Sequence, residues 1–205
     1  MIRLSRLKGA FSAAVCAFGL AACSSAPIHY YTLVPAASPV AHAPSADFAF
    51  ELLPVQLPAD VDTPQLVVRD GQAGEQLMDN EHWVAPLSDQ IQQALSAHLS
   101  QDLSAQDLTG LPQGQRHVLR VRVNVRRFES MPGQHALLEA AWVVHPLWQG
   151  QGHDLVCSSQ IRVPVTAGYE ALMLGHQQAL ASLSRQIASV AAPLASGLTP
   201  ACPAG

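Results

Sequence analysis

The stretch His117–Phe128 reads HVLRVRVNVRRF, and apolar and polar residues alternate along it. Successive side chains of a β-strand point to opposite faces of a sheet, so the pattern predicts a strand with one buried and one exposed face. The predicted buried face carries Leu119, Val121, Val123 and Val125, and the exposed face carries Arg120, Arg122, Asn124 and Arg126. Arg127 followed directly by Phe128 breaks the alternation, which indicates a β-bulge.

Two more strands are predicted after this one, over 136–145 and 155–163, because the same alternation returns in both. Pro132-Gly133 and the polar turn 149–152 separate the segments. Consecutive strands joined by short polar turns predict an antiparallel meander.

Outward from the meander, both flanks carry regular elements. Before it we expect strands over 30–34, 48–57 and 65–69, and a short extended piece over 78–84. Apolar residues at helical spacing predict a helix from Pro86 to Leu103 and another from Gly168 to about Ala192, where Pro193 should end it. The predicted fold is α/β: a mixed, largely antiparallel sheet of about five to six strands packed with two main amphipathic helices, in the order strands-helix-strands-helix.

The N-terminus has the parts of a secretory leader. Basic residues occur before an apolar stretch, Ala10–Phe18, and the sequence Leu20-Ala21-Ala22-Cys23 follows. This box is typical of bacterial lipoproteins, in which the cysteine receives diacylglycerol and a further acyl chain such as palmitate. Ser24 rather than Asp after the cysteine favours the outer membrane. An ordinary cleaved leader with a chance cysteine is the alternative.

These features divide the chain into four parts. We predict a lipoprotein signal peptide over 1–22, then a lipidated N-terminus, first strand and tether over 23–46. A single α/β domain is expected over 47–192 and a flexible C-terminal tail over 193–205.

Charge excludes one class of function. The leader holds three of the eleven basic residues and none of the fifteen acids, so eight basic residues remain and the mature formal charge is −7. Nucleic-acid binding needs a basic face, so this charge disfavours it.

The cysteines suggest one crosslink. Cys16 leaves with the leader and Cys23 carries lipid, so Cys157 and Cys202 remain, and an oxidising compartment favours a disulfide between them. Two unpaired thiols are the alternative.

No residue pattern indicates an enzyme or a cofactor. The chain lacks a Gly-x-Ser-x-Gly elbow, a phosphate-binding loop and a His-Glu-x-x-His helix, and its histidines are scattered, so no metal site is predicted. Arg120, Arg122 and Arg126 could bind phosphate, carboxylate or an acidic partner. A solvated sheet face with Glu139 as cross-strand partner is the alternative. Trp83 is either a contact for a partner or a core residue.

The mature chain resembles the PqiC/YmbA-type ABC-transport auxiliary lipoproteins over nearly all of residues 23–192. The similar segments, in order, are Tyr30-Tyr31-Thr32-Leu33, Leu53-Pro54-Val55-Gln56-Leu57-Pro58, Asp62-Thr63-Pro64-Gln65-Leu66-Val67-Val68-Arg69, Asp79–Leu87 (DNEHWVAPL), Leu138-Glu139-Ala140-Ala141-Trp142 and Gly168-Tyr169-Glu170-Ala171-Leu172 running into 179–184.

The resemblance implies a non-catalytic subunit of an MCE-associated lipid transport system that maintains membrane integrity. Its implied partner is an MCE-domain protein, with the membrane reached through the N-terminal lipid; a homo-oligomer is implied by analogy. A structural lipoprotein of a secretion or pilus assembly system is the alternative function, and a periplasmic hydrolase is disfavoured for want of a nucleophile constellation.

Overall fold

The computed structural model describes residues 26–36, 44–148 and 154–203. Its elements are β1 (His29–Tyr31), β2 (Phe48–Leu52), β3 (Gln65–Asp70), β4 (Gly74–Trp83), α2 (Leu87–Asp102), β5 (Gln106–Asp107), β6 (His117–Met131), β7 (His135–Pro146), β8 (Leu155–Pro164) and α3 (Tyr169–Ala195). The prediction of a mixed, largely antiparallel α/β fold with two helices is confirmed. The strands form two sheets of three and five strands.

The five-stranded sheet has the order β5-β2-β6-β7-β8. The predicted meander is confirmed, because β6 pairs antiparallel with β7 and β7 with β8. The register shifts between Val125 and Arg127, so the predicted bulge is also present, with Arg126 as the extra residue. β2 lies beside β6 in the parallel direction and ends at Leu52, five residues before the predicted strand ends. Pro54 has no N–H to donate, and beyond it only the single bridge Gln56–Asn124 continues the pairing.

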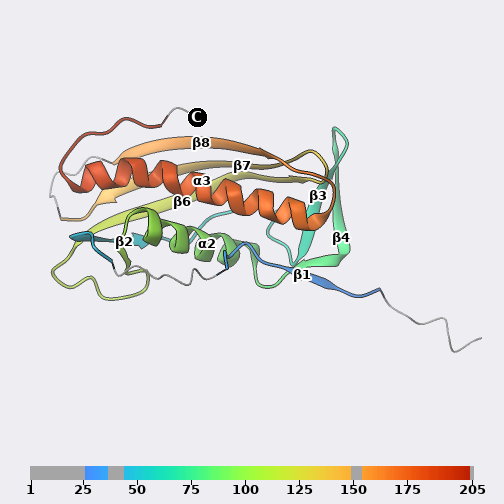
Figure 1. The fold of residues 1–205 in the computed structure, drawn as a ribbon, viewed down its shortest axis with the longest axis horizontal. Helices are drawn as coiled ribbons and strands as arrows, with labels where there is room; N and C mark the ends of the chain where they lie inside the picture. Colours follow the sequence, from blue (N-terminus) through green and yellow to red (C-terminus); the bar gives the residue numbers. More distant parts are fainter. Residues whose placement is uncertain (1–25, 37–43, 149–153, 204–205) are drawn as a thin grey trace, which may run out of the picture.

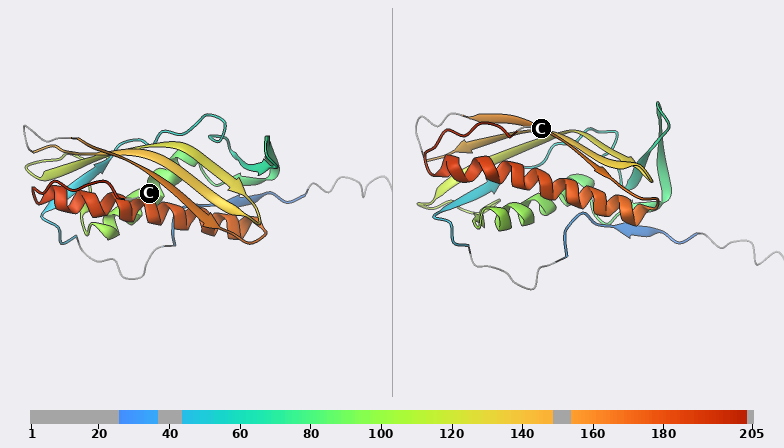
Figure 2. Two further views of the ribbon diagram at one scale, coloured as in Figure 1. Left: turned by 90° about the horizontal axis from the view of Figure 1, so that it is seen from above. Right: turned by 45° about the horizontal axis from the view of Figure 1, so that its top comes forward.

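Both helices cover one face of this sheet (Figures 1 and 2). The apolar face of β6 predicted from its alternation is buried there, together with the apolar stripes of α2 and α3. The opposite face of β6, with Arg120, Arg122 and Arg126, points away from the helices. We call the surface on this side of β2, β6, β7 and β8 the open sheet face.

The smaller sheet has the order β1-β4-β3. β3 and β4 form an antiparallel hairpin whose turn places Gly71 at φ +65°, and β1 pairs parallel with β4. β4 begins at Gly74, so it is longer than the extended piece predicted over 78–84. Figure 1 shows the hairpin standing across the end of the large sheet.

Leu33, in the strand predicted over 30–34, is fully buried in the main core. The predicted end of the second helix needs correction, because α3 continues through Pro193 to Ala195. A proline this close to the helix end removes only one backbone hydrogen bond, and Leu194 and Ala195 pack against the core. The predicted tail over 193–205 therefore begins too early.

Candidate docking surface and C-terminal clasp

The predicted arginine row lies on the open sheet face, but its members differ in their partners. Nε of Arg120 lies 2.9 Å from Oε2 of Glu51 on the neighbouring strand β2, so this charge is largely compensated. Arg122 and Arg126 form no ion pair with any residue that the structure describes. Both are exposed, so two of the three guanidinium groups of this row remain uncompensated.

Arg122 borders a shallow hollow of about 250 Å³. Its lining residues come from four strands and their flanks: Leu53, Arg120, Arg122, Val143, His145 and Asp154. On the far side of the hollow, Nδ1 of His145 lies 2.5 Å from Oδ1 of Asp154. The floor is apolar and half-buried at Val143, which pairs with both Arg122 and Val156 across the sheet. Cationic and apolar groups therefore meet at one place.

Arg126 owes its position to the bulge. Because it is the extra residue, it has no partner residue on β7, and it borders a second open hollow of about 820 Å³ that extends over Ala141 and Ser158 to the β8 edge. Glu139, considered as a partner for the arginine row, is instead 3.7 Å from Nη1 of Arg127 and accepts a hydrogen bond from Gln160. Because of the bulge, Glu139 lies opposite Arg127 and forms its ion pair with that residue, so Arg126 remains uncompensated.

Trp83 does not contribute to this surface. Only 5% of it is exposed, and its indole packs edge-on to Phe128 with ring centroids 6.2 Å apart. Of the two interpretations of Trp83, the structure favours the core.

A cluster that sequence reasoning missed joins the two sheets. Oε2 of Glu129 on β6 lies 2.6 Å from Nη2 of Arg127 and 3.7 Å from Nε of Arg69 on β3, and Oε1 lies 2.8 Å from Nε2 of His135. Burial works against the Glu129 carboxylate, but hydrogen bonds with His135 and Arg127 and the positive charges of Arg127 and Arg69 overcome this effect and lower its pKa. Its partly buried position between Arg127 and Arg69 gives it a structural role.

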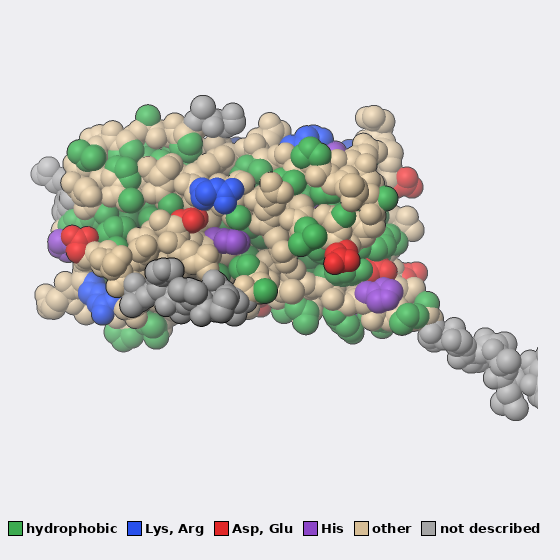
Figure 3. All heavy atoms as spheres, in the orientation of Figure 1, with side chains coloured by type: hydrophobic (Ala, Val, Ile, Leu, Met, Phe, Trp, Pro, Cys, Tyr) green, Lys and Arg blue, Asp and Glu red, His purple; other side chains and the backbone are tan. Residues whose placement is uncertain are grey.

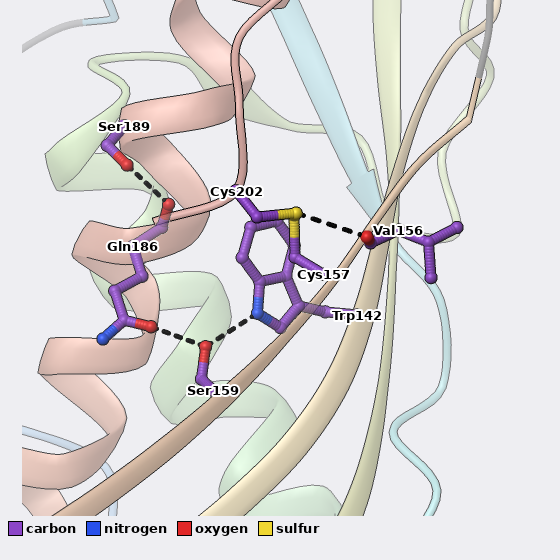
Figure 4. The surroundings of a disulfide bond; sticks show 7 residues. All are labelled: Trp142, Val156, Cys157, Ser159, Gln186, Ser189 and Cys202. Carbon is purple, nitrogen blue, oxygen red and sulfur yellow. Dashed lines mark hydrogen bonds between the residues drawn. A yellow bond between two sulfur atoms is a disulfide. The ribbon is translucent and has the colours of Figure 1, made fainter. Parts of the chain in front are cut away.

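The structure joins Cys157 on β8 to Cys202 in a disulfide with Cα atoms 5.6 Å apart. β8 is an edge strand, and Figure 4 shows the tail carrying Cys202 beside it. Sγ of Cys202 lies 3.3 Å from the carbonyl oxygen of Val156; a disulfide sulfur has no proton to donate, so this is a contact and not a hydrogen bond. Beneath it, Trp142 Nε1 donates to Ser159 Oγ, which donates to Gln186 on α3. The bond holds the tail against the edge of the sheet.

Other predicted features lie elsewhere. Cys23 and the leader over 1–22 fall outside the described residues. In the part of the chain that is described, no three His, Cys, Asp or Glu side chains gather in a way that could hold a metal ion. Neither α2 nor α3, the helices described, combines the length and apolar character of a membrane span.

Comparison with known proteins supports the fold and the family. Residues 31–188 match the family described as ABC-type transport auxiliary lipoprotein component. No curated protein matches the sequence. An uncharacterized protein of known crystal structure superposes with a TM-score of 0.64 and 19% identity, over 80% of this chain and 98% of the other. A Xanthomonas campestris protein assigned to the family DUF330 has a TM-score of 0.57 and 17% identity, over 82% of this chain and 96% of the other.

At such identities the two crystal structures establish the fold alone. The family match spans more than three quarters of the sequence, including α2 and most of α3, and it agrees with the motifs found in the sequence. The chain belongs to the family of ABC-type transport auxiliary lipoprotein components.

Proposed function

We propose that this protein is a lipid-anchored accessory subunit on the periplasmic side of the outer membrane. It would serve an MCE/ABC-type phospholipid transport system and so maintain outer-membrane integrity. Membership of the auxiliary lipoprotein family carries the proposal, and the Leu-Ala-Ala-Cys sequence at 20–23 supports the anchor. The role is non-enzymatic: the subunit docks a partner, and energy comes from a nucleotide-binding protein elsewhere in the system.

The open sheet face is the surface we propose for docking an acidic region of the MCE-domain partner. Arg122 and Arg126 project there beside the half-buried, apolar Val143 and Ala141. Arginine suits such a site because its planar guanidinium binds carboxylates through two hydrogen bonds and is weakly hydrated. A desolvated charge pair surrounded by apolar contacts contributes more to binding than a fully solvated pair does.

Charge reversal tests the docking surface. The double variant Arg122→Glu/Arg126→Glu should lose most of the partner recovered when the tagged lipoprotein is captured from solubilised membranes, because like charges then face each other. Arg185→Glu is the matched control, since this exposed arginine lies on α3 in the helical layer. Equal recovery of the partner with all three proteins would exclude the open face as the docking site.

The same capture separates the proposed system from its alternative. Recovery of an MCE-domain protein would support lipid transport. A deletion strain should then be as sensitive to detergent as a strain that lacks the partner. Recovery of secretin-like rings would instead assign the protein to a secretion or pilus assembly system. The mass of the solubilised wild-type protein tests the homo-oligomer implied by the resemblance.

A further inference from the structure

The outward side of β1 and β4 is an apolar surface close to the proposed lipid anchor. β1 pairs parallel with β4, and Tyr30 is the partner of His82. Because side chains alternate along a strand, Ile28, Tyr30, His82 and Val84 point to one side of this small sheet. We call these four residues the β1–β4 outer surface.

The opposite side of the same strands faces the protein and fixes this orientation. The Tyr31 hydroxyl donates to Oε2 of Glu81 at 2.6 Å, and Nδ1 of His29 lies 3.1 Å from Oε1 of the same carboxylate. Glu81 and Trp83 are both buried. A shift of one residue would expose these groups, so the register that buries them also turns Tyr30 and Val84 outward.

The β1–β4 outer surface is strongly exposed. Ile28 is 49%, Tyr30 62% and Val84 57% exposed, and the Tyr30 ring stands edge-on to His82 with centroids 5.9 Å apart. Single exposed apolar side chains are ordinary, but several on one side of one small sheet indicate a contact surface. No Lys, Arg, Asp or Glu is among the four residues, so a charged partner has little to recognise there.

The position of this surface in the sequence decides what it meets. Ile28 follows Cys23 by five residues, and a chain of that length spans at most about 18 Å even when fully extended. Acyl chains on Cys23 would therefore hold the β1–β4 outer surface within that distance of the bilayer. Figure 3 shows apolar side chains at the end of the molecule that carries β1.

We propose that the β1–β4 outer surface rests on the phospholipid bilayer, with Tyr30 and Val84 at the depth of the headgroups. Tyrosine favours this depth because its ring is apolar and its hydroxyl can remain hydrated. The inference rests on the proposed lipidation of Cys23. The acyl chains supply the attachment, and the surface sets the orientation of the domain, so that the start of β6 lies far from the membrane.

Depth-dependent quenching tests the contact in the full-length lipidated protein. The fluorophore NBD is attached to one introduced cysteine in each of three variants: Tyr30→Cys, Val84→Cys and the control Leu111→Cys. Cys157 and Cys202 do not react with the label because they form the disulfide. Leu111 is 55% exposed and lies in the loop before β6. This loop lies far from the β1–β4 outer surface. His117, where β6 begins, is about 36 Å along the strand from Phe128, which packs against Trp83 of the small sheet. The protein is placed in phosphatidylethanolamine–phosphatidylglycerol vesicles with or without lipids spin-labelled near the headgroup.

We expect quenching about threefold stronger at positions 30 and 84 than at 111, and unchanged in high salt because the surface has no fixed charge. The Val84→Cys variant retains Tyr30, so it reports on the intact ring. Mass spectrometry first establishes that the protein is lipidated. If quenching is then equally weak at all three positions, the inference is overturned and the proposed function stands. NBD emission at positions 30 and 84 that is shifted to the blue but not quenched would show that a protein, and not lipid, covers the surface. This result would also overturn the inference. An unmodified Cys23 would remove this inference and the lipid anchor, and the proposed transport role would then rest on the family match alone.

Discussion

His176 is an ionisable residue that is fully buried within the core. It lies on α3, its ring stacks on Phe128 at 4.0 Å between centroids, and Nε2 lies 2.9 Å from the hydroxyl of Ser130. Nδ1 has no hydrogen-bond partner among the described residues. Burial, with a smaller effect of nearby His135, lowers the pKa of His176 to about 3. His176 is therefore neutral in the folded protein at neutral pH.

This burial predicts an acid-dependent loss of stability. Between pH 6.5 and about 3 the unfolded chain binds a proton at position 176 that the folded chain does not, so stability falls as the pH falls. The contribution between pH 6.5 and 5 is roughly 1.5 kcal/mol. His176→Gln should flatten this part of a plot of unfolding free energy against pH, measured by urea titration. His82→Gln, a change outside the core, should keep the wild-type slope; a parallel curve for His176→Gln would contradict the prediction.

At the scale of elements, the C-terminal tail and β8 depend on one bond. The disulfide closes a loop with a sequence separation of 45 residues, which in the chain-entropy model stabilises the fold by about 4 kcal/mol. The tail also lies beside β8, the edge strand of the large sheet. Cys202→Ser should therefore lower the free energy of unfolding by up to about 4 kcal/mol. Wild-type protein measured with a reductant should show the same decrease, and an unchanged urea midpoint in both would show that the bond is dispensable.

At the scale of the whole molecule, Glu129 connects the two sheets through Arg69 on β3 while His135 and Arg127 hold it on the larger sheet. Glu129→Gln keeps the shape and removes the charge, so we expect a loss of about 1–2 kcal/mol, discounted because the arginines are partly exposed. The lowered pKa of Glu129 stabilises the fold above the unfolded value of 4.5 and ceases to do so as the pH falls through the folded value. The variant should therefore differ least from the wild type in acid below the folded pKa of Glu129. Glu75→Gln, at the exposed partner of Arg69, is the control. Comparable losses for both variants would contradict the role assigned to Glu129.

Some parts of this protein could be read from local sequence. Alternation in 117–163 predicted which side of each meander strand is buried, the break at Arg127 predicted the bulge, and apolar spacing predicted both helices. These predictions succeeded because the period of apolar residues reports directly which face is removed from water. The family resemblance has the same origin, since it rests on short segments in a fixed order.

Other parts were decided only by tertiary structure. Segments distant in the chain decide how the strands divide into two sheets and why β2 lies parallel to β6. They also decide that Arg120 pairs with Glu51 while Arg126 has no ion-pair partner among the described residues. The polar side chain of Gln90 on α2 is also buried, because its Oε1 accepts hydrogen bonds from Thr32 and Leu33. Backbone hydrogen bonds are the same for every choice of neighbouring strand, so a sequence pattern shows that a strand has a buried face but not which strand lies beside it. The neighbour of each strand is decided by how the apolar faces of all the elements pack together in the core.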